Sequence, residues 1–242
     1  MDTDNNIINV FYKLEFEDGN FFEFDINLKL RDKNQHSPEK PSWTKLDFNK
    51  CPSCPLDSAI HSHCPAALSI VPLIKNFNKM ASYEKVNCLV KDGERFCHAE
   101  TSLQQAISSI MGLYLATSSC PILEKLQPMA RFHLPFASHY ETTYRAVSMY
   151  LLAEYFRSVN NKQHIPFSLK PLIELYKTIN VVNNSLARRI KSACENDASI
   201  NSLIILDVFA QMIPYEIEND LKNLEELFAP YLKQPDTLPK SA

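Results

Sequence analysis

The sequence predicts an α+β protein, in which two β-hairpins form a small antiparallel sheet packed against a larger helical body. Two segments near the N-terminus alternate apolar and polar residues, as half-buried strands do. A second pair of short segments flanks an Asp-Gly turn, and much of the remaining chain repeats apolar residues at helical spacing. We expect residues 1–160 to form an α+β domain with cysteine-rich loops. Residues 161–242 should form a helical region packed on it, or continuous with it in a single domain.

The first hairpin is predicted over residues 10–30. Its apolar faces match when Phe16 lies opposite Phe22, because successive side chains along a strand point to opposite faces. This register leaves a short loop in which Gly19 or Asn20 takes a positive φ.

The second hairpin is predicted over residues 84–99, with Asp92 and Gly93 as a two-residue turn. In that register Cys88 lies directly opposite Cys97 on one face. We expect two reduced, buried thiols there, because a cross-strand disulfide is rare in a reducing compartment.

Helices account for most of the remaining chain. They are expected at residues 66–80, 101–118, 139–158 and 168–233. The third begins with a capping box, in which Ser138 and Glu141 satisfy each other's backbone N–H groups. The last stretch should break into three or four helices, near Asn183, Asp197 and Pro214.

The composition narrows the classes of function. Lys and Arg total 25 against 28 for Asp and Glu, so the chain has no basic footprint for nucleic acid or a membrane surface. Only three glycines are present, which excludes the glycine-rich phosphate loops of Walker-type ATPases and GxGxxG dinucleotide folds. With a polar N-terminus and no long apolar run, we expect a cytoplasmic protein without a nucleic-acid or membrane partner. A protein partner stays open.

Proline follows four of the seven cysteines, namely Cys51, Cys54, Cys64 and Cys120. With 15 prolines among 242 residues, chance places one after a given cysteine about one time in sixteen. Proline fixes φ and lacks an N–H, so it turns the chain rigidly away after each sulfur. Four thiolates held on such turns can complete a tetrahedral zinc site or bind an iron–sulfur cluster. We expect these four cysteines to converge as metal ligands.

The identity of the metal stays open at this point. The single C-x2-C pair favours an iron–sulfur cluster slightly over zinc, because structural zinc sites usually use two such pairs. His61 or His63 could replace one sulfur, since neutral imidazole binds both metals. Without a metal, these cysteines would be small buried apolar residues in proline-rich loops, or Cys51 and Cys54 would form a redox pair.

A second candidate site lies around residues 128–141. Irregular backbone is expected to hold Arg131 and His133 beside the N-terminus of a capped helix. Arg145 follows Glu141 by one helical turn, so the two could form an ion pair. The arginines could bind an anion and His133 could transfer a proton, which would suit an enzyme. The structural alternative pairs Arg131 with a carboxylate and His133 with a buried carbonyl.

Several motifs resemble those of a small bacterial family of unknown function. They are WTKLDFNKCPSCPL at residues 43–56, HCP at 63–65, TSSCP at 117–121 and MARFHLPF at 129–136. The resemblance runs from the first hairpin to about residue 158. It implies that these segments belong to one unit, and it transfers no reaction, cofactor or site residue.

Together these patterns predict a cytoplasmic metal-binding protein with a four-cysteine centre in a sensing or interaction role. One alternative is an enzyme with an anion-binding pocket around Arg131, His133, Glu141 and Arg145. A metal-free helical interaction module is the other alternative.

Overall fold

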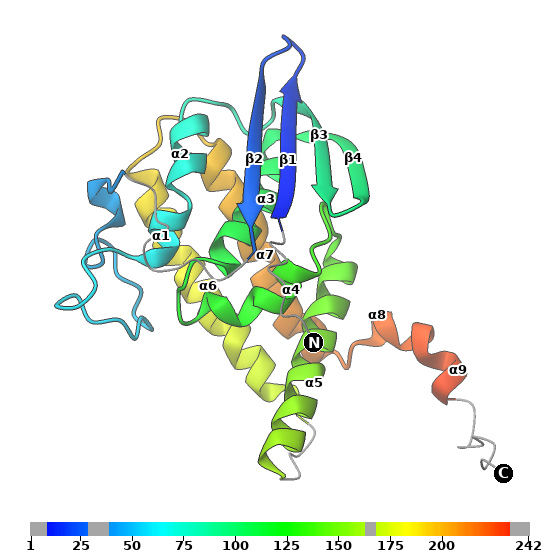
Figure 1. Cartoon of the computed structure of the whole chain (residues 1–242). Coiled ribbons are helices and arrows are strands. Elements are labelled where there is room, and N and C mark those ends of the chain that lie inside the picture. Colours follow the sequence, from blue (N-terminus) through cyan, green and yellow to red (C-terminus); the bar gives the residue numbers. More distant parts are fainter. Residues whose placement is uncertain (1–8, 29–38, 163–167, 233–242) are drawn as a thin grey trace, which may run out of the picture.

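The computed structural model describes residues 9–28, 39–162 and 168–232. The ends of two predicted segments, residues 29–30 and residue 233, lie outside these ranges. One four-stranded antiparallel sheet with the strand order β2-β1-β3-β4 packs on a helical body (Figure 1), which confirms the predicted α+β class. The strands are β1 (Asn9–Phe16), β2 (Phe21–Asn27), β3 (Lys85–Asp92) and β4 (Arg95–Ser102).

The first hairpin forms, but its register differs from the predicted one by two residues. Leu14, rather than Phe16, lies opposite Phe22. The loop consists of residues 17–19, because Gly19 takes its last position with a φ of +84°. A shift of two residues leaves every side chain on its predicted face, so the buried face of the strand is unchanged.

The turn of the second hairpin was also predicted at the wrong residues. Asp92 lies opposite Arg95, so the turn consists of Gly93 and Glu94. Of these two residues only Gly93 has a positive φ, of +61°. This is the pattern of a type II′ turn, whose first central position requires glycine.

The shifted register changes the pairing of the two hairpin cysteines. Cys88 lies opposite Ala99, and Cys97 lies opposite Val90, so the predicted direct pairing of the two thiols is wrong. Both cysteines are free thiols, Cys88 buried and Cys97 half-buried.

The helical body contains long and short helices within the described residues. Its larger helices are α3 (Leu103–Ala116), α5 (His139–Asn161), α6 (Lys170–Lys191) and α7 (Ala198–Glu218). The shorter elements are η1 (Ser42–Thr44), α1 (Pro65–Ser69), α2 (Val71–Phe77), η2 (Leu123–Leu126), α4 (Gln127–Arg131), α8 (Lys222–Glu225), η3 (Glu226–Phe228) and α9 (Ala229–Leu232). α3 contacts β3 and β4 of the sheet and also packs along α7, which in turn packs along α6.

Two of the three expected helix breaks do not occur. α6 runs through Asn183, because this amide donates to Asp207 of α7 (3.2 Å), as Asn180 does (2.9 Å). These hydrogen bonds between the helices engage asparagine side chains that could otherwise bond to the nearby backbone and favour a turn. α7 continues through Pro214, close to its C-terminal end. The break near Asp197 is confirmed, since α7 begins immediately after it.

A single hydrophobic core includes residues from Val10 to Ile217, so it draws on both predicted parts of the chain. The boundary near residue 160 stays a prediction. One helix in the described ranges, α7, is long and apolar enough to cross a membrane by length and composition. It packs against α3, α5 and α6, and a single helix of this kind is weak evidence of a membrane span.

Candidate functional site

The four cysteines that precede prolines come from two loops beside the helical body. Cys51 and Cys54 lie in the loop between η1 and α1, which extends beside α1 in Figure 1. Cys64 immediately precedes α1, and Cys120 lies between α3 and η2. Cys51, Cys64 and Cys120 are buried, and Cys54 is half-buried.

Local turns explain why proline follows these residues. Cys64 is the N-cap of α1 with an extended backbone (φ −73°, ψ 120°), and proline occupies the start of the helix, where no N–H is needed. The segment after Cys120 also turns, since the N–H of Glu124 donates to its carbonyl oxygen (2.9 Å). The N–H of Cys54 likewise donates to the carbonyl oxygen of Cys51 (3.0 Å). Cys51, Cys64 and Cys120 thus each stand at the start of a turn, whereas Cys54 ends the turn that Cys51 begins.

All six pairs among these cysteines interact electrostatically. Burial is the main cause that raises the pKa of the Cys51 thiol to about 11, and the charges of Cys64, Cys54 and Cys120 raise it further. Burial also raises the pKa of Cys64 and of Cys120, and Cys54 adds to both shifts. The fold therefore brings cysteines that are far apart in the sequence within electrostatic range of one another.

The sulfurs do not form a closed metal site in this arrangement. Within residues 9–28, 39–162 and 168–232, no group of three or more His, Cys, Asp or Glu side chains is placed to hold a metal ion. Of the two alternative ligands, His63 has its Nδ1 2.8 Å from the Ser62 hydroxyl. The backbone N–H of His61 donates to the backbone carbonyl of Asp57 (2.8 Å). Ligation of a metal by the four cysteines stays a prediction.

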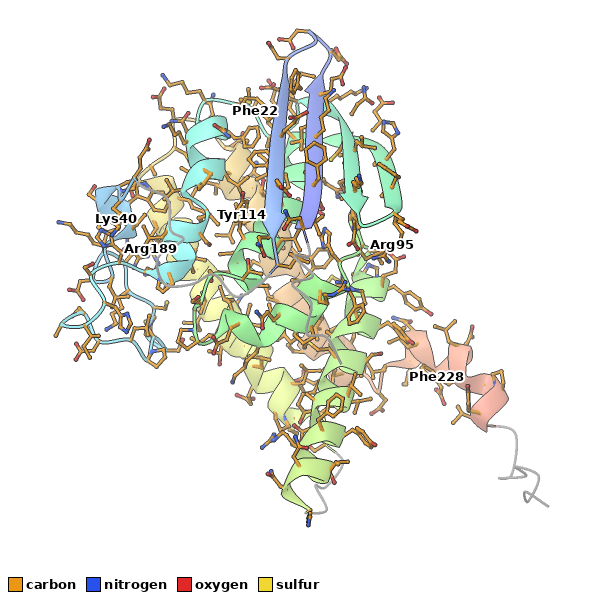
Figure 2. The ribbon with its side chains drawn as sticks, viewed as in Figure 1. Phe22, Lys40, Arg95, Tyr114, Arg189 and Phe228 are labelled. Atoms are coloured by element: carbon orange, nitrogen blue, oxygen red, sulfur yellow. The ribbon has the colours of Figure 1, made fainter. Side chains whose placement is uncertain are left out.

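A buried arginine holds the segment that precedes these cysteines. Arg189 of α6 is 1% exposed and donates to the carbonyl oxygens of Trp43 (2.8 Å), Lys45 (2.7 Å) and Leu46 (2.9 Å). Figure 2 shows Arg189 between α6 and this segment. None of the ion pairs in the described part of the chain involves it. Its charge instead opposes the effect of burial on the pKa of Cys64.

Sequence reasoning missed Arg189. It lies in the last turn of α6 with Arg188 and Lys191, where cations are common because they complement the helix dipole. No local pattern distinguishes the one arginine whose side chain is buried.

The second predicted site does not assemble from its four residues. Arg131 ends the short helix α4, is exposed, and lies over the ring of Phe132. Glu141 is exposed and forms the predicted capping box with Ser138, whose N–H donates to its carboxylate (2.8 Å). No ion pair in the described residues joins Glu141 to Arg145. The expected irregular backbone is also helical up to Arg131.

His133 and Arg145 do meet, at the wall of a cavity of about 180 Å³. The cavity lies among α3, α4, α5, α6 and α7. Arg145 Nη2 donates to the carbonyl oxygens of Met129 (2.6 Å) and Phe132 (2.9 Å). Burial lowers the pKa of Arg145, because it disfavours the charged guanidinium.

A buried tyrosine joins His133 to the sheet. The Tyr12 hydroxyl lies 2.5 Å from Nε2 of His133 and 2.9 Å from Oγ of Ser109. Burial, aided by the charge of Arg145, lowers the pKa of His133 to about 3, so its ring is neutral near pH 7. Sequence reasoning missed Tyr12 and Ser109, because both have the spacing of ordinary core residues.

Residues 10–229 match the family model described as Domain of unknown function (DUF6901). The chain belongs to the DUF6901 family. The match agrees with the expected uncharacterised family, and it extends beyond residue 158 through α6, α7 and α8. Neither the curated proteins nor the solved structures contain a significant match to this DUF6901 chain.

Proposed function

We propose that this DUF6901 protein binds a zinc ion or an iron–sulfur cluster through Cys51, Cys54, Cys64 and Cys120, and that the centre serves a sensing or interaction role. The observation that carries the proposal is the mutual electrostatic interaction of these four cysteines, which come from two loops, with Cys51, Cys64 and Cys120 each at the start of a turn. In contrast, Cys194 follows the end of α6, outside this set.

The surrounding charges suit an anionic centre. Four thiolates around Zn²⁺ carry a net charge of about −2, which is costly to bury unless positive groups lie nearby. Arg189 supplies a buried positive charge next to Cys64. The N–H groups of Ala67 and Ala66 stabilise the Cys64 thiolate, and those at the start of η2 do the same for Cys120. Neutral thiols that serve only to fill the core gain little from such an environment.

Closing the centre requires the sulfurs to point toward one position. A cysteine side chain has one rotatable bond, which moves its sulfur among three staggered positions. The four thiols interact electrostatically, so we expect rotation of their side chains to bring the sulfurs together while metal binding supplies the free energy. Such a centre would fasten the loop before α1 to the end of α3, and its loss would release that loop. This coupling is the basis of the proposed sensing role.

The anion-pocket enzyme receives less support. Arg131 and Glu141 are exposed and engaged elsewhere, so only two of its four residues reach the cavity. The other alternative, a metal-free interaction module, is the interpretation that metal-free wild-type protein would favour in the test below.

The test is elemental analysis of anaerobically purified protein, with iron, zinc and acid-labile sulfide measured per chain. We expect either about one zinc, or iron and sulfide in equal amounts near two or four each, because four thiolates hold either cluster type. Cys54→Ser, Cys64→Ser and Cys120→Ser should each at least halve the metal content. The matched controls Cys194→Ser and Cys88→Ser should leave it unchanged. Metal-free wild-type protein, or a bound metal indifferent to Cys120→Ser, would contradict the proposal.

A further inference from the structure

The cavity beside Arg145 has the size and lining of a binding site for a small organic molecule. Its volume is about 180 Å³, and its wall includes Leu113, Leu126, Met129, Phe209 and Ile213. An apolar cavity of ~150 Å³ is large enough for benzene. The wall is mostly apolar, so it favours a ligand with a hydrocarbon body.

The guanidinium of Arg145 has donor capacity that the protein does not use. Its Nη2 is bonded to two backbone carbonyls, but its Nε is buried and has no partner among the described residues. No described carboxylate forms an ion pair with it. A buried donor without an acceptor is unfavourable, and a carboxylate is the acceptor that best matches the geometry and charge of a guanidinium.

Three other polar side chains on the wall already have partners. The ring of His133 and the hydroxyl of Ser109 are engaged with Tyr12, and the amide of Asn183 donates to Asp207. Arg145 is thus the cation on this wall with a free donor among the described residues. A phosphate or sulfate ion would need more donors and would leave the apolar wall unfilled.

We infer that this cavity binds a small monocarboxylate with an apolar body, its carboxylate at Arg145 and its hydrocarbon part along α3 and α7. The site is separate from the cysteine centre, and the inference does not depend on metal binding. The inferred site shares Arg145 and His133 with the predicted anion pocket. Apolar wall residues take the place of Arg131 and Glu141 in it.

Isothermal titration of the full-length protein with hexanoate, 1-hexanol and inorganic phosphate tests this inference. Hexanoate should bind saturably at one site per chain, 1-hexanol at least tenfold more weakly, and phosphate should not compete. Arg145→Met should weaken hexanoate at least tenfold and change 1-hexanol less than threefold. The matched control Arg131→Met, which removes an exposed arginine nearby, should change neither.

A second variant covers the case in which Arg145→Met does not fold. Ala210 lies on the cavity wall on α7, and Ala210→Leu should occupy part of the space and abolish hexanoate binding. The inference is overturned if the wild-type protein binds no hexanoate, or binds 1-hexanol as tightly. It is also overturned if phosphate displaces hexanoate, if Arg131→Met has the effect expected of Arg145→Met, or if Ala210→Leu binds hexanoate normally.

Discussion

Replacing the buried Arg189 with methionine should destabilise the protein strongly. Methionine keeps an unbranched apolar side chain but removes the guanidinium, so the carbonyls of Trp43 and Leu46 lose the arginine as donor, whereas that of Lys45 keeps the N–H of Phe48. The bonds to Trp43 and Leu46 are buried, whereas the bond to Lys45 is only partly so. Each buried acceptor left without a donor costs about 1–3 kcal/mol. Two such acceptors predict a loss of about 2–6 kcal/mol in the free energy of unfolding.

Thermal unfolding followed by circular dichroism measures this loss. For a chain of this size, Tm falls by about 2–4 °C per kcal/mol, so a loss of about 4 kcal/mol lowers Tm by roughly 8–16 °C. Arg189→Lys should fall between the wild type and Arg189→Met, because it keeps the charge but not the planar fork of donors. Limited proteolysis should show cleavage of Arg189→Met between residues 39 and 64.

Arg188→Met is the matched control. Arg188 is the preceding residue of α6, is exposed, and donates from Nε to the carbonyl of Asn184 in its own helix (3.3 Å). Its replacement should change stability by no more than about 0.5 kcal/mol. If Arg189→Met lowers Tm no more than Arg188→Met does, the buried arginine does not hold the cysteine-bearing segment as described.

Two further predictions concern α5 and the buried histidine. Ser138→Ala removes the hydroxyl that accepts the N–H of Glu141 (3.2 Å), so it should cost about 1 kcal/mol in denaturant unfolding; an unchanged midpoint would contradict a capping role. The pKa of His133 is about 3 in the folded chain, below its ordinary 6.5, so the unfolded chain binds one more proton between these values. Stability should therefore fall by about 1.4 kcal/mol per pH unit as the pH drops from 6.5 toward 3. His133→Gln should have a shallower slope by that amount, and equal slopes would show that the neutral ring is not buried in the folded state.

The strand registers show what an apolar pattern can predict. Alternation identifies the buried face, and that face is correct in both hairpins. It does not identify the pairing offset, because a shift of two residues preserves the face. The offset depends on which loop position needs a positive φ, and Gly19 and Gly93 each occupy a different loop position from the one expected.

The same limit applies to the candidate sites, where local patterns could be read from the sequence and contacts between distant segments could not. The Cys-Pro pattern is local, so the sequence alone could single out the four cysteines. Arg189 and Tyr12 act through contacts with segments more than 90 positions away, which no local pattern reports. The structure brings together only part of the residues predicted at 128–141, for a related reason. Arg131 and His133 are close in the chain, yet one faces solvent and the other contacts the sheet.

X-ray absorption spectroscopy at the edge of the bound metal tests the four-cysteine centre most directly. For zinc, the proposal predicts four sulfur neighbours at about 2.3 Å, and for an iron–sulfur cluster it predicts sulfur-only coordination of iron. In Cys120→Ser protein that retains metal, one thiolate sulfur should be lost from the coordination shell. A shell dominated by nitrogen or oxygen, or a shell that Cys120→Ser leaves unchanged, would contradict the account.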